Sequence, residues 1–277
     1  MSAVMEKRAT ELPFAATTPI HVARVGLRSG DAEQLAEFYK ALLGLEETGR
    51  GADSVSLGVA GRELLEIEGS QALKPDNPRS AGLYHTAFLL PSRKDLARWV
   101  GYATENGIRL DGASDHLVSE ALYLTDPDGN GIEIYADRAK EKWPSADGQI
   151  QMATEPLDFR GLLGELSGDD IGWKGAPVGS VIGHVHLRVG DIAVAEAWWN
   201  DTIGLDTMVH YGNAAVFLSS GGYHHHIGAN VWQSRGAASR SPDTSGLNFV
   251  ELASAHAKDR REVMDPWGTA VRISPAT

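Results

Sequence analysis

Two segments of the chain repeat the same alternation of hydrophobic and polar positions. Residues 24–45 align with residues 184–205 at a constant offset of 160. In each copy an alternating stretch predicts a strand, and hydrophobic positions at helical spacing then predict an amphipathic helix. The helix positions are Leu35, Phe38, Tyr39 and Leu42 in one copy and Ile192, Ala195, Trp198 and Trp199 in the other. We interpret these aromatic stripes as core packing.

The repeat belongs to a set of four modules, each with the order strand, helix and three strands. The modules span residues 20–70, 82–136, 181–232 and 245–275. Asp31 and Asp191 stand where the first and third helices begin and can cap them. After these helices, strands are expected at 53–59 and 62–68, and at 214–219 and 223–232.

Modules two and four show a second similarity, in which Asp-Pro-x-Gly makes a tight turn into the last strand. These turns begin at Asp126 and Asp265. Module two has its own helix at about 93–105, whereas module four is short and has hardly any room for a helix.

The predicted fold is therefore α+β, with four β-α-β-β-β modules, the fourth reduced, that form two cupped domains of mixed sheet. The expected organisation is an N-terminal tail at 1–19, a first half at 20–136, a connection at 137–180 and a second half at 181–277. The connection is rich in proline and glycine and is long for a loop.

Composition limits which partners, cellular location and metal ligands the protein can have. The formal net charge is −12 and no basic patch is visible, so nucleic acid is not an expected partner. No apolar run approaches the length of a membrane span and no signal peptide is recognisable, so we expect a cytoplasmic protein without a membrane partner. There are no cysteines, which leaves His, Asp and Glu as metal ligands.

The four modules, with GHVHLRVGD opening one and YLTDPDGNGIEIY closing another, resemble the vicinal oxygen chelate superfamily over nearly the whole chain. Residues 116–133 are similar to the signature of extradiol ring-cleavage dioxygenases, and the layout is most similar to catechol 2,3-dioxygenases. The matching positions are His116, Leu122-Tyr123, Asp126-Pro127, Gly129 and Glu133, with a departure at Ser114.

The resemblance implies an Fe(II) site held by two imidazoles and a carboxylate, and Mn(II) accepts the same ligands. The family's ligand positions fall on His85, Glu133 and His184. His186 competes with His184 because it lies on the same face of the strand, but the repeat register favours His184, since His186 aligns with Gly26.

These ligands do not come from neighbouring modules. Pairing modules two and three collects all three ligands, and leaves Arg24, Phe249 and Arg272 for a cup formed by modules one and four. The alternative is a dimer that exchanges modules between chains, and the sequence leaves both arrangements open.

The resemblance also implies second-sphere residues. His225 matches the family's acid–base histidine, and we interpret it as standing where isomerases of the superfamily have a fourth ligand. His116 and Tyr123 would hydrogen-bond the substrate oxygens. His224 and His226 should point to the opposite face of the strand, and His21, His210 and His256 are interpreted as surface or structural residues.

The expected function is extradiol (meta) cleavage of a catechol with O2. One alternative is a glyoxalase-like metal-dependent isomerase or lyase, and another is a metal-free protein that binds or sequesters a small molecule. The sequence does not determine which substituent the catechol ring carries, nor whether the protein forms a homo-oligomer.

Overall fold

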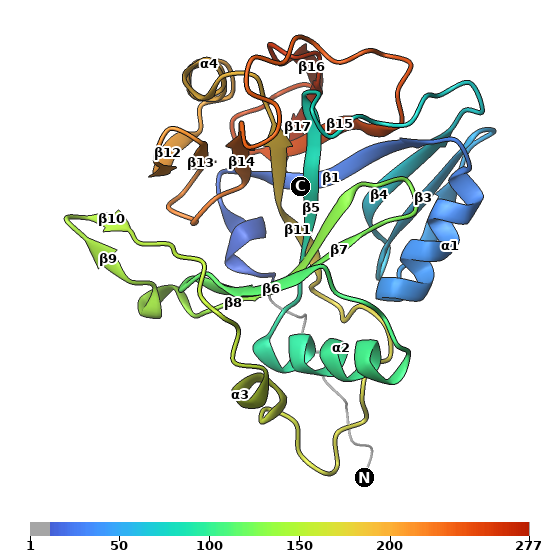
Figure 1. The fold of residues 1–277 in the computed structure, drawn as a ribbon, viewed down its shortest axis with the longest axis vertical. Coiled ribbons are helices and arrows are strands. Elements are labelled where there is room, and N and C mark those ends of the chain that lie inside the picture. Colours follow the sequence, from blue (N-terminus) through green and yellow to red (C-terminus); the bar gives the residue numbers. More distant parts are fainter. Residues whose placement is uncertain (1–11, 277) are drawn as a thin grey trace.

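The computed structural model describes residues 12–276, which form two mixed β-sheets with helices on their outer faces (Figure 1). Module one comprises β1 (Ile20–Ser29), α1 (Ala32–Leu43), β2 (Glu46–Arg50), β3 (Ser54–Val59) and β4 (Arg62–Gly69). Module two comprises β5 (Gly82–Leu89), α2 (Arg93–Glu105), β6 (Gly112–Asp115), β7 (Ser119–Thr125) and β8 (Gly131–Asp137). The predicted helix at 93–105 is confirmed.

The second half of the chain repeats this order with one reduction. Module three comprises β11 (Val181–Arg188), α4 (Ile192–Trp198), the π-helical turn η3 (Trp199–Ile203), β12 (Asp206–Tyr211), β13 (Ala215–Ser219) and β14 (Ile227–Asn230). Module four has only the strands β15 (Gly246–Ser254), β16 (Arg261–Met264) and β17 (Ala270–Pro275). Turns replace a helix between β15 and β16, as its length predicted.

Each sheet takes one module from each half of the chain. The seven-stranded sheet has the order β16-β17-β15-β1-β4-β3-β2, and the eight-stranded sheet has the order β12-β13-β14-β11-β5-β8-β7-β6. Modules two and three therefore pair within one chain through antiparallel β5 and β11, and modules one and four pair through β1 and β15. The predicted pairing of module two with module three is confirmed, whereas the proposed domain boundaries stay a prediction.

The first and third modules' helices begin at the capping residues that the sequence predicted. The Asp31 side chain accepts a hydrogen bond from the backbone N–H of Gln34, and Asp191 accepts one from Val194. Both caps satisfy a donor that the helix leaves unpaired. The aromatic stripes pack against the core, where Tyr39 and Trp199 are almost fully enclosed and Phe38 and Trp198 are partly buried.

One predicted strand is shorter than expected. The sequence predicted a strand over 223–232, but β14 begins only at Ile227, and the preceding histidines lie in an irregular bend. Alternation along a strand therefore does not set the directions of His224, His225 and His226. Each takes its direction from its own hydrogen bonds.

The flanking segments pack against the eight-stranded sheet. In the predicted tail, η1 (Phe14–Thr17) is a 3-10 turn whose Ala15 and Ala16 are buried. The connection contains η2 (Lys140–Lys142), β9 (Ser145–Ala146), β10 (Gln149–Ile150) and α3 (Phe159–Leu163). The connection also reaches the sheet, because its residue Glu155 forms an isolated β-bridge with Asp115 of β6.

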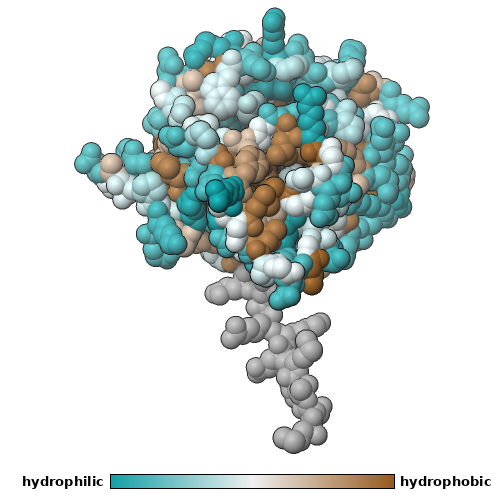
Figure 2. Space-filling model, turned by 60° about the horizontal axis from the view of Figure 1, so that its bottom comes forward, coloured by the Kyte–Doolittle hydropathy of each residue, from teal (hydrophilic) through white to brown (hydrophobic). Residues whose placement is uncertain are grey.

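Figure 2 shows hydrophobic side chains at the centre of the face that lies at the bottom of Figure 1, with hydrophilic side chains around them. Separately, four large hydrophobic residues of the connection are exposed to solvent, namely Phe159, Leu163, Ile171 and Val178. Among the described residues, no helix has the length and apolar character needed to cross a bilayer. The homo-oligomer stays a prediction.

The two sheets are joined by a buried hydrogen bond between modules one and two. The Tyr39 hydroxyl on α1 donates to Asp126 Oδ2 in the Asp-Pro-x-Gly turn, at 3.0 Å. Tyr39→Phe should lower the free energy of unfolding by about 1–2 kcal/mol, because a buried hydrogen bond to a carboxylate is lost. Urea unfolding measures this change.

The matched control is Tyr102→Phe, whose hydroxyl makes a solvent-accessible bond to the Ala41 carbonyl. Water can replace that bond, so the control should lose less stability. Equal losses in both variants would show that the Tyr39 bond has no special role in joining the sheets.

Candidate metal centre

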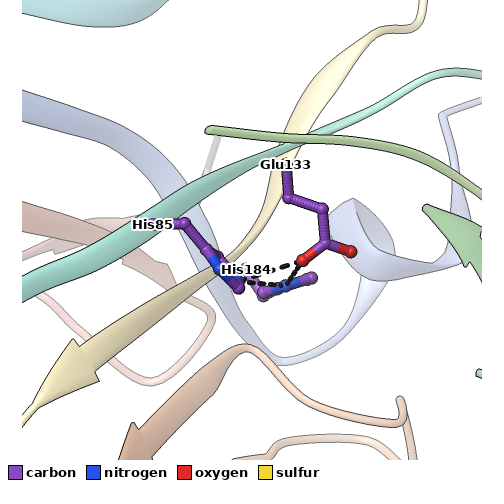
Figure 3. A group of neighbouring side chains, drawn as sticks. All are labelled: His85, Glu133 and His184. Atoms are coloured by element: carbon purple, nitrogen blue, oxygen red, sulfur yellow. Dashed lines mark hydrogen bonds and ion pairs between the residues drawn. The ribbon is translucent and has the colours of Figure 1, made fainter. Parts of the chain in front are cut away.

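Three side chains from three adjacent strands meet on one face of the eight-stranded sheet (Figure 3). His85 lies on β5, Glu133 on β8 and His184 on β11. The separations are 3.0 Å from His85 Nε2 to Glu133 Oε2, 3.2 Å from His184 Nε2 to the same oxygen and 3.3 Å between the two imidazole nitrogens. Among residues 12–276, this is the one group of three or more His, Asp or Glu side chains placed to share a metal ion.

The distances suit one face of an octahedron. A metal about 2.1 Å from each ligand separates neighbouring ligand atoms of an octahedron by about 3.0 Å. All three side chains are at least nine-tenths buried. Two imidazoles and one carboxylate on one face, with the remaining positions open, form the donor set of non-haem Fe(II) oxygenases.

The protonation states also suit metal binding. Burial raises the pKa of Glu133, but the adjacent His184 and His85 outweigh this effect and hold the pKa well below its usual value. Burial lowers the pKa of His184 to about 4, despite the opposing effect of Glu133. The carboxylate is therefore ionised and the His184 ring neutral near pH 7, which are the forms that bind metals.

The sheet register explains why there are three such side chains and not four. β5 and β11 pair so that His85 and His184 take equivalent places, and Glu133 on β8 lies beside Ala87. The place on β14 equivalent to that of Glu133 lies beside His186 and is occupied by Gly228. The sequence analysis assigned this fourth place to His225, and the register corrects that assignment.

A cavity of about 530 Å³ opens over the three side chains. All six predicted site residues line it, namely His85, His116, Tyr123, Glu133, His184 and His225. Met152, Ala153 and Thr154 of the connection form part of its wall. That contribution was not predicted, because a loop carries no periodic signal for its packing.

His225 is oriented by a chain of hydrogen bonds. His224 Nε2 lies 2.9 Å from Asp137 Oδ1, and His224 Nδ1 lies 2.8 Å from His225 Nδ1. Because a carboxylate only accepts, His224 donates through Nε2 and accepts through Nδ1. His225 then donates from Nδ1, which leaves its Nε2 as a proton acceptor.

Burial, followed by the nearby His184 and His224, lowers the pKa of His225 well below its usual value. The ring is therefore neutral near pH 7. No role in the site was predicted for His224, but His224 connects His225 to Asp137.

His116 and Tyr123 form a second hydrogen-bonded pair. His116 Nδ1 lies 2.7 Å from the Ala153 carbonyl, so it carries the ring proton, and its Nε2 accepts from the Tyr123 hydroxyl at 2.6 Å. Burial and then Glu133 raise the pKa of Tyr123 well above its usual value, which keeps the phenol protonated. The pair faces the cavity from the turn between β6 and β7 and from β7 itself.

The remaining histidines lie outside the three-residue group, and of those described below only His186 lines the cavity. His21, His210 and His256 lie outside the cavity, and His226 points away from it into hydrogen bonds with Ala15 and Ser219. His186, the competitor of His184, lines the cavity but is not part of the three-residue group.

Ion pairs line the cup of modules one and four. Arg24 bonds to Glu63, Glu66 and Glu251. Phe249 lies between two guanidinium groups, 5.3 Å from that of Arg24 and 3.6 Å from that of Arg272. The three residues predicted for this cup therefore meet.

Comparison with known proteins agrees with this geometry. The family described as "Glyoxalase/Bleomycin resistance protein/Dioxygenase superfamily" matches residues 21–134. The chain is 40% identical over 247 residues to catechol-2,3-dioxygenase of Bacillus subtilis (strain 168), covering 87% of this chain and 85% of that protein. It is 28% identical over 117 residues to biphenyl-2,3-diol 1,2-dioxygenase 2 of Rhodococcus globerulus, covering 42% and 62%.

The fold is also similar to that of maize glyoxalase I, with a TM-score of 0.56, 12% identity, and coverage of 93% of this chain and 92% of that one. The chain belongs to the glyoxalase/bleomycin resistance protein/dioxygenase superfamily. Within it, the protein is an enzyme of the extradiol, ring-cleaving dioxygenase class.

Removing a ligand should empty the metal centre. We expect wild-type protein loaded anaerobically with Fe(II) to hold about one ion per chain, and His85→Ala and Glu133→Ala to hold almost none, because two ligands cannot replace the complete donor set. Elemental analysis after desalting measures this. His210→Ala removes an exposed histidine and should keep the metal. Stoichiometric iron in Glu133→Ala would contradict the site.

His226 should make stability depend on pH. Burial lowers its pKa to about 3, although its bond to the Ala15 carbonyl opposes the shift. The stabilisation due to its neutral ring is complete above about pH 6.5, and it is lost as pH falls towards 3, because the unfolded chain takes up the proton first.

His226→Asn should therefore lose less stability than wild type between pH 7 and pH 5, as measured by urea midpoints. His256→Asn removes an exposed histidine that forms no ion pair among residues 12–276, and it should keep the wild-type dependence. Parallel curves for wild type and His226→Asn would contradict the assignment.

Proposed function

We propose that the protein cleaves the ring of a catechol with O2 at an Fe(II) ion held by His85, Glu133 and His184, by the extradiol (meta) route. The carrying observation is that three buried ligand atoms lie 3.0–3.3 Å apart in the cavity that also contains His225, His116 and Tyr123. The similarity to a catechol-2,3-dioxygenase over most of both chains supports the same substrate class.

The register disfavours the isomerase alternative. An added Cβ at Gly228 would lie 2.9 Å from the His186 ring, so a side chain at the position of a fourth ligand would require that ring to move. Three ligands leave more positions for small molecules than four. A metal-free binding protein is disfavoured because burying a carboxylate and two imidazoles costs free energy, and without a metal no bound ion would offset that cost.

The side chains that handle the substrate's protons lie on two sides of the cavity, with His225 on one side and the His116–Tyr123 pair on the other. When bound, iron lowers the pKa of the catechol hydroxyls and brings both substrates together. His225 Nε2 accepts the proton from one hydroxyl and is held in the required tautomer by His224 and Asp137. Tyr123 donates to His116, so its oxygen accepts a hydrogen bond from the remaining hydroxyl of the monoanion.

We further propose Fe(II) as the working metal, with Mn(II) as the ion that the same ligands also accept. A cytoplasmic location, and the lack of nucleic-acid and membrane partners, follow from charge and composition and form part of the proposal.

The test is oxygen uptake by protein loaded anaerobically with Fe(II) and then given catechol. We expect one O2 consumed per catechol and a coloured ring-fission product. Bound iron without oxygen uptake would favour an isomerase or lyase. If no iron binds, the metal centre is wrong.

His225→Ala should lower kcat by about 100-fold or more and change the Kd for catechol far less, because general base catalysis typically contributes this much. Stopped-flow turnover and anaerobic titration separate the two quantities. His256→Ala removes an exposed histidine outside the cavity and should keep wild-type kcat. An unchanged kcat in His225→Ala would remove His225 from the mechanism.

A further inference from the structure

A row of polar side chains continues from the metal centre along β11. His184, His186 and Arg188 alternate with Val185 and Leu187, which are buried in the core. Residues two apart on a strand share a face and are about 7 Å apart. All three polar residues line the 530 Å³ cavity, so the row leads away from the metal along its wall.

His186 offers a buried nitrogen that the protein does not use. The residue is 3% exposed, and its Nε2 has no hydrogen-bond partner within residues 12–276. Its ring lies among the rings of Tyr84, Trp232 and Phe217, at centroid distances of 5.1, 5.2 and 5.7 Å. A buried polar atom without a partner destabilises the fold, so a polar group of a bound ligand would remove that cost.

Arg188 belongs to a cluster with excess positive charge. Its Nε donates to the Ser80 carbonyl and its Nη2 to Asp76, while Nη1 has no partner in the described chain. Asp76 is shared, because Arg240 Nε lies 3.7 Å from its other oxygen. Arg28 is also close enough to Arg240 to lower its pKa, and no ion pair of Arg28 is found among residues 12–276.

Two guanidinium groups, those of Arg188 and Arg240, therefore share the Asp76 carboxylate, and the Arg28 guanidinium lies close to that of Arg240, in a protein whose net charge is −12. Burial lowers the pKa of Arg240; Asp76 opposes this effect, and Arg28 and Arg188 add to it. Partly buried cations without enough counter-charge favour binding of an anion.

The acidic residues of the cavity lie elsewhere. Glu133 is in the metal centre, and Asp111 precedes β6, the edge strand on the far side of β5 from β11. An anionic substituent is therefore favoured only on the β11 side. Cavities of this size hold ligands larger than one aromatic ring, so a side chain has room.

We propose that the preferred substrate is a catechol with a carboxylate-bearing side chain, which extends along β11 so that the carboxylate accepts hydrogen bonds from His186 and Arg188. The inference rests on the proposed catechol dioxygenase function and specifies its substrate class. His186 and Arg188 are specificity-determining residues in this arrangement, and the rings of Tyr84 and Trp232 flank the side chain.

The test compares acids with their neutral esters. The probes are 2,3- and 3,4-dihydroxyphenylacetate and their methyl esters, titrated anaerobically into Fe(II)-loaded protein, with unsubstituted catechol as reference. We expect at least one acid to bind about tenfold or more tightly than its ester, because a site built for a polar group rejects the analogue that lacks it.

The positive charge of Arg188 should account for the tighter binding of the acid than of its ester. The ratio of ester Kd to acid Kd should fall to about one in Arg188→Gln, whereas Arg188→Lys should retain part of it. Arg160→Gln removes the same charge from an exposed position on α3 and should keep the wild-type ratio. An unchanged ratio in Arg188→Gln would overturn the proposal.

Two variants separate hydrogen bonding by His186 from packing. His186→Phe keeps a ring over Gly228 and should lower the ratio, while His186→Asn should lower it less. The opposite order would overturn the role of His186. If Arg188→Gln does not fold, as judged by circular dichroism, the two His186 variants decide the proposal.

The two levels of inference fail differently. If catechol is cleaved but both acids bind no better than their esters, the substrate class is wrong and the proposed function stands. If the iron-loaded protein neither binds nor cleaves any of the catechols, the proposed function fails and the substrate class with it.

Discussion

The antiparallel pairing of β5 with β11 is the contact on which the site depends. It joins strands about 100 residues apart and places His85 and His184 within 3.3 Å of each other. Parallel β8 then brings Glu133 beside them. Because β-sheet pairing fixes side chains to one face at a fixed spacing, the backbone register positions all three ligands before any metal binds. The connection at 137–180 provides the length that this crossing requires.

The same architecture is used twice with different chemistry. In one sheet the equivalent positions hold His184, His85 and Glu133, and in the other they hold Arg24, Phe249 and Arg272. Gly26 takes the place of His186, and a side chain there would meet Phe249. One cup thus contains ion pairs and contacts between guanidinium groups and an aromatic ring, while the other opens above its three candidate ligands. Repetition of the fold explains the shape of both cups, and the side chains at these few positions decide what each can bind.

The site is also asymmetric within the open cup. On the side of β14, Asp137 and His224 orient His225, and on the opposite side, Ala153 and His116 orient Tyr123. On the β11 side, Gly228 leaves a space that the His186 ring fills. The pseudo-symmetric sheet therefore supplies the ligands in matched places, and single departures from that symmetry supply the proton chemistry and the direction in which a substrate can extend.

The sequence by itself determined the modules, the helix caps at Asp31 and Asp191 and the Asp-Pro-x-Gly turns, and through the family resemblance it predicted six of the residues that line the cavity. These features depend on local periodicity, or on motifs a few residues long. Tertiary structure decided that module two pairs with module three inside one chain, that β14 begins only after the three histidines, and that Gly228 stands at the fourth position. It also decided the contacts of His224, Ala153, His186 and Arg188. Such contacts join residues far apart in the sequence, and their energies depend on register and packing, which no local pattern encodes.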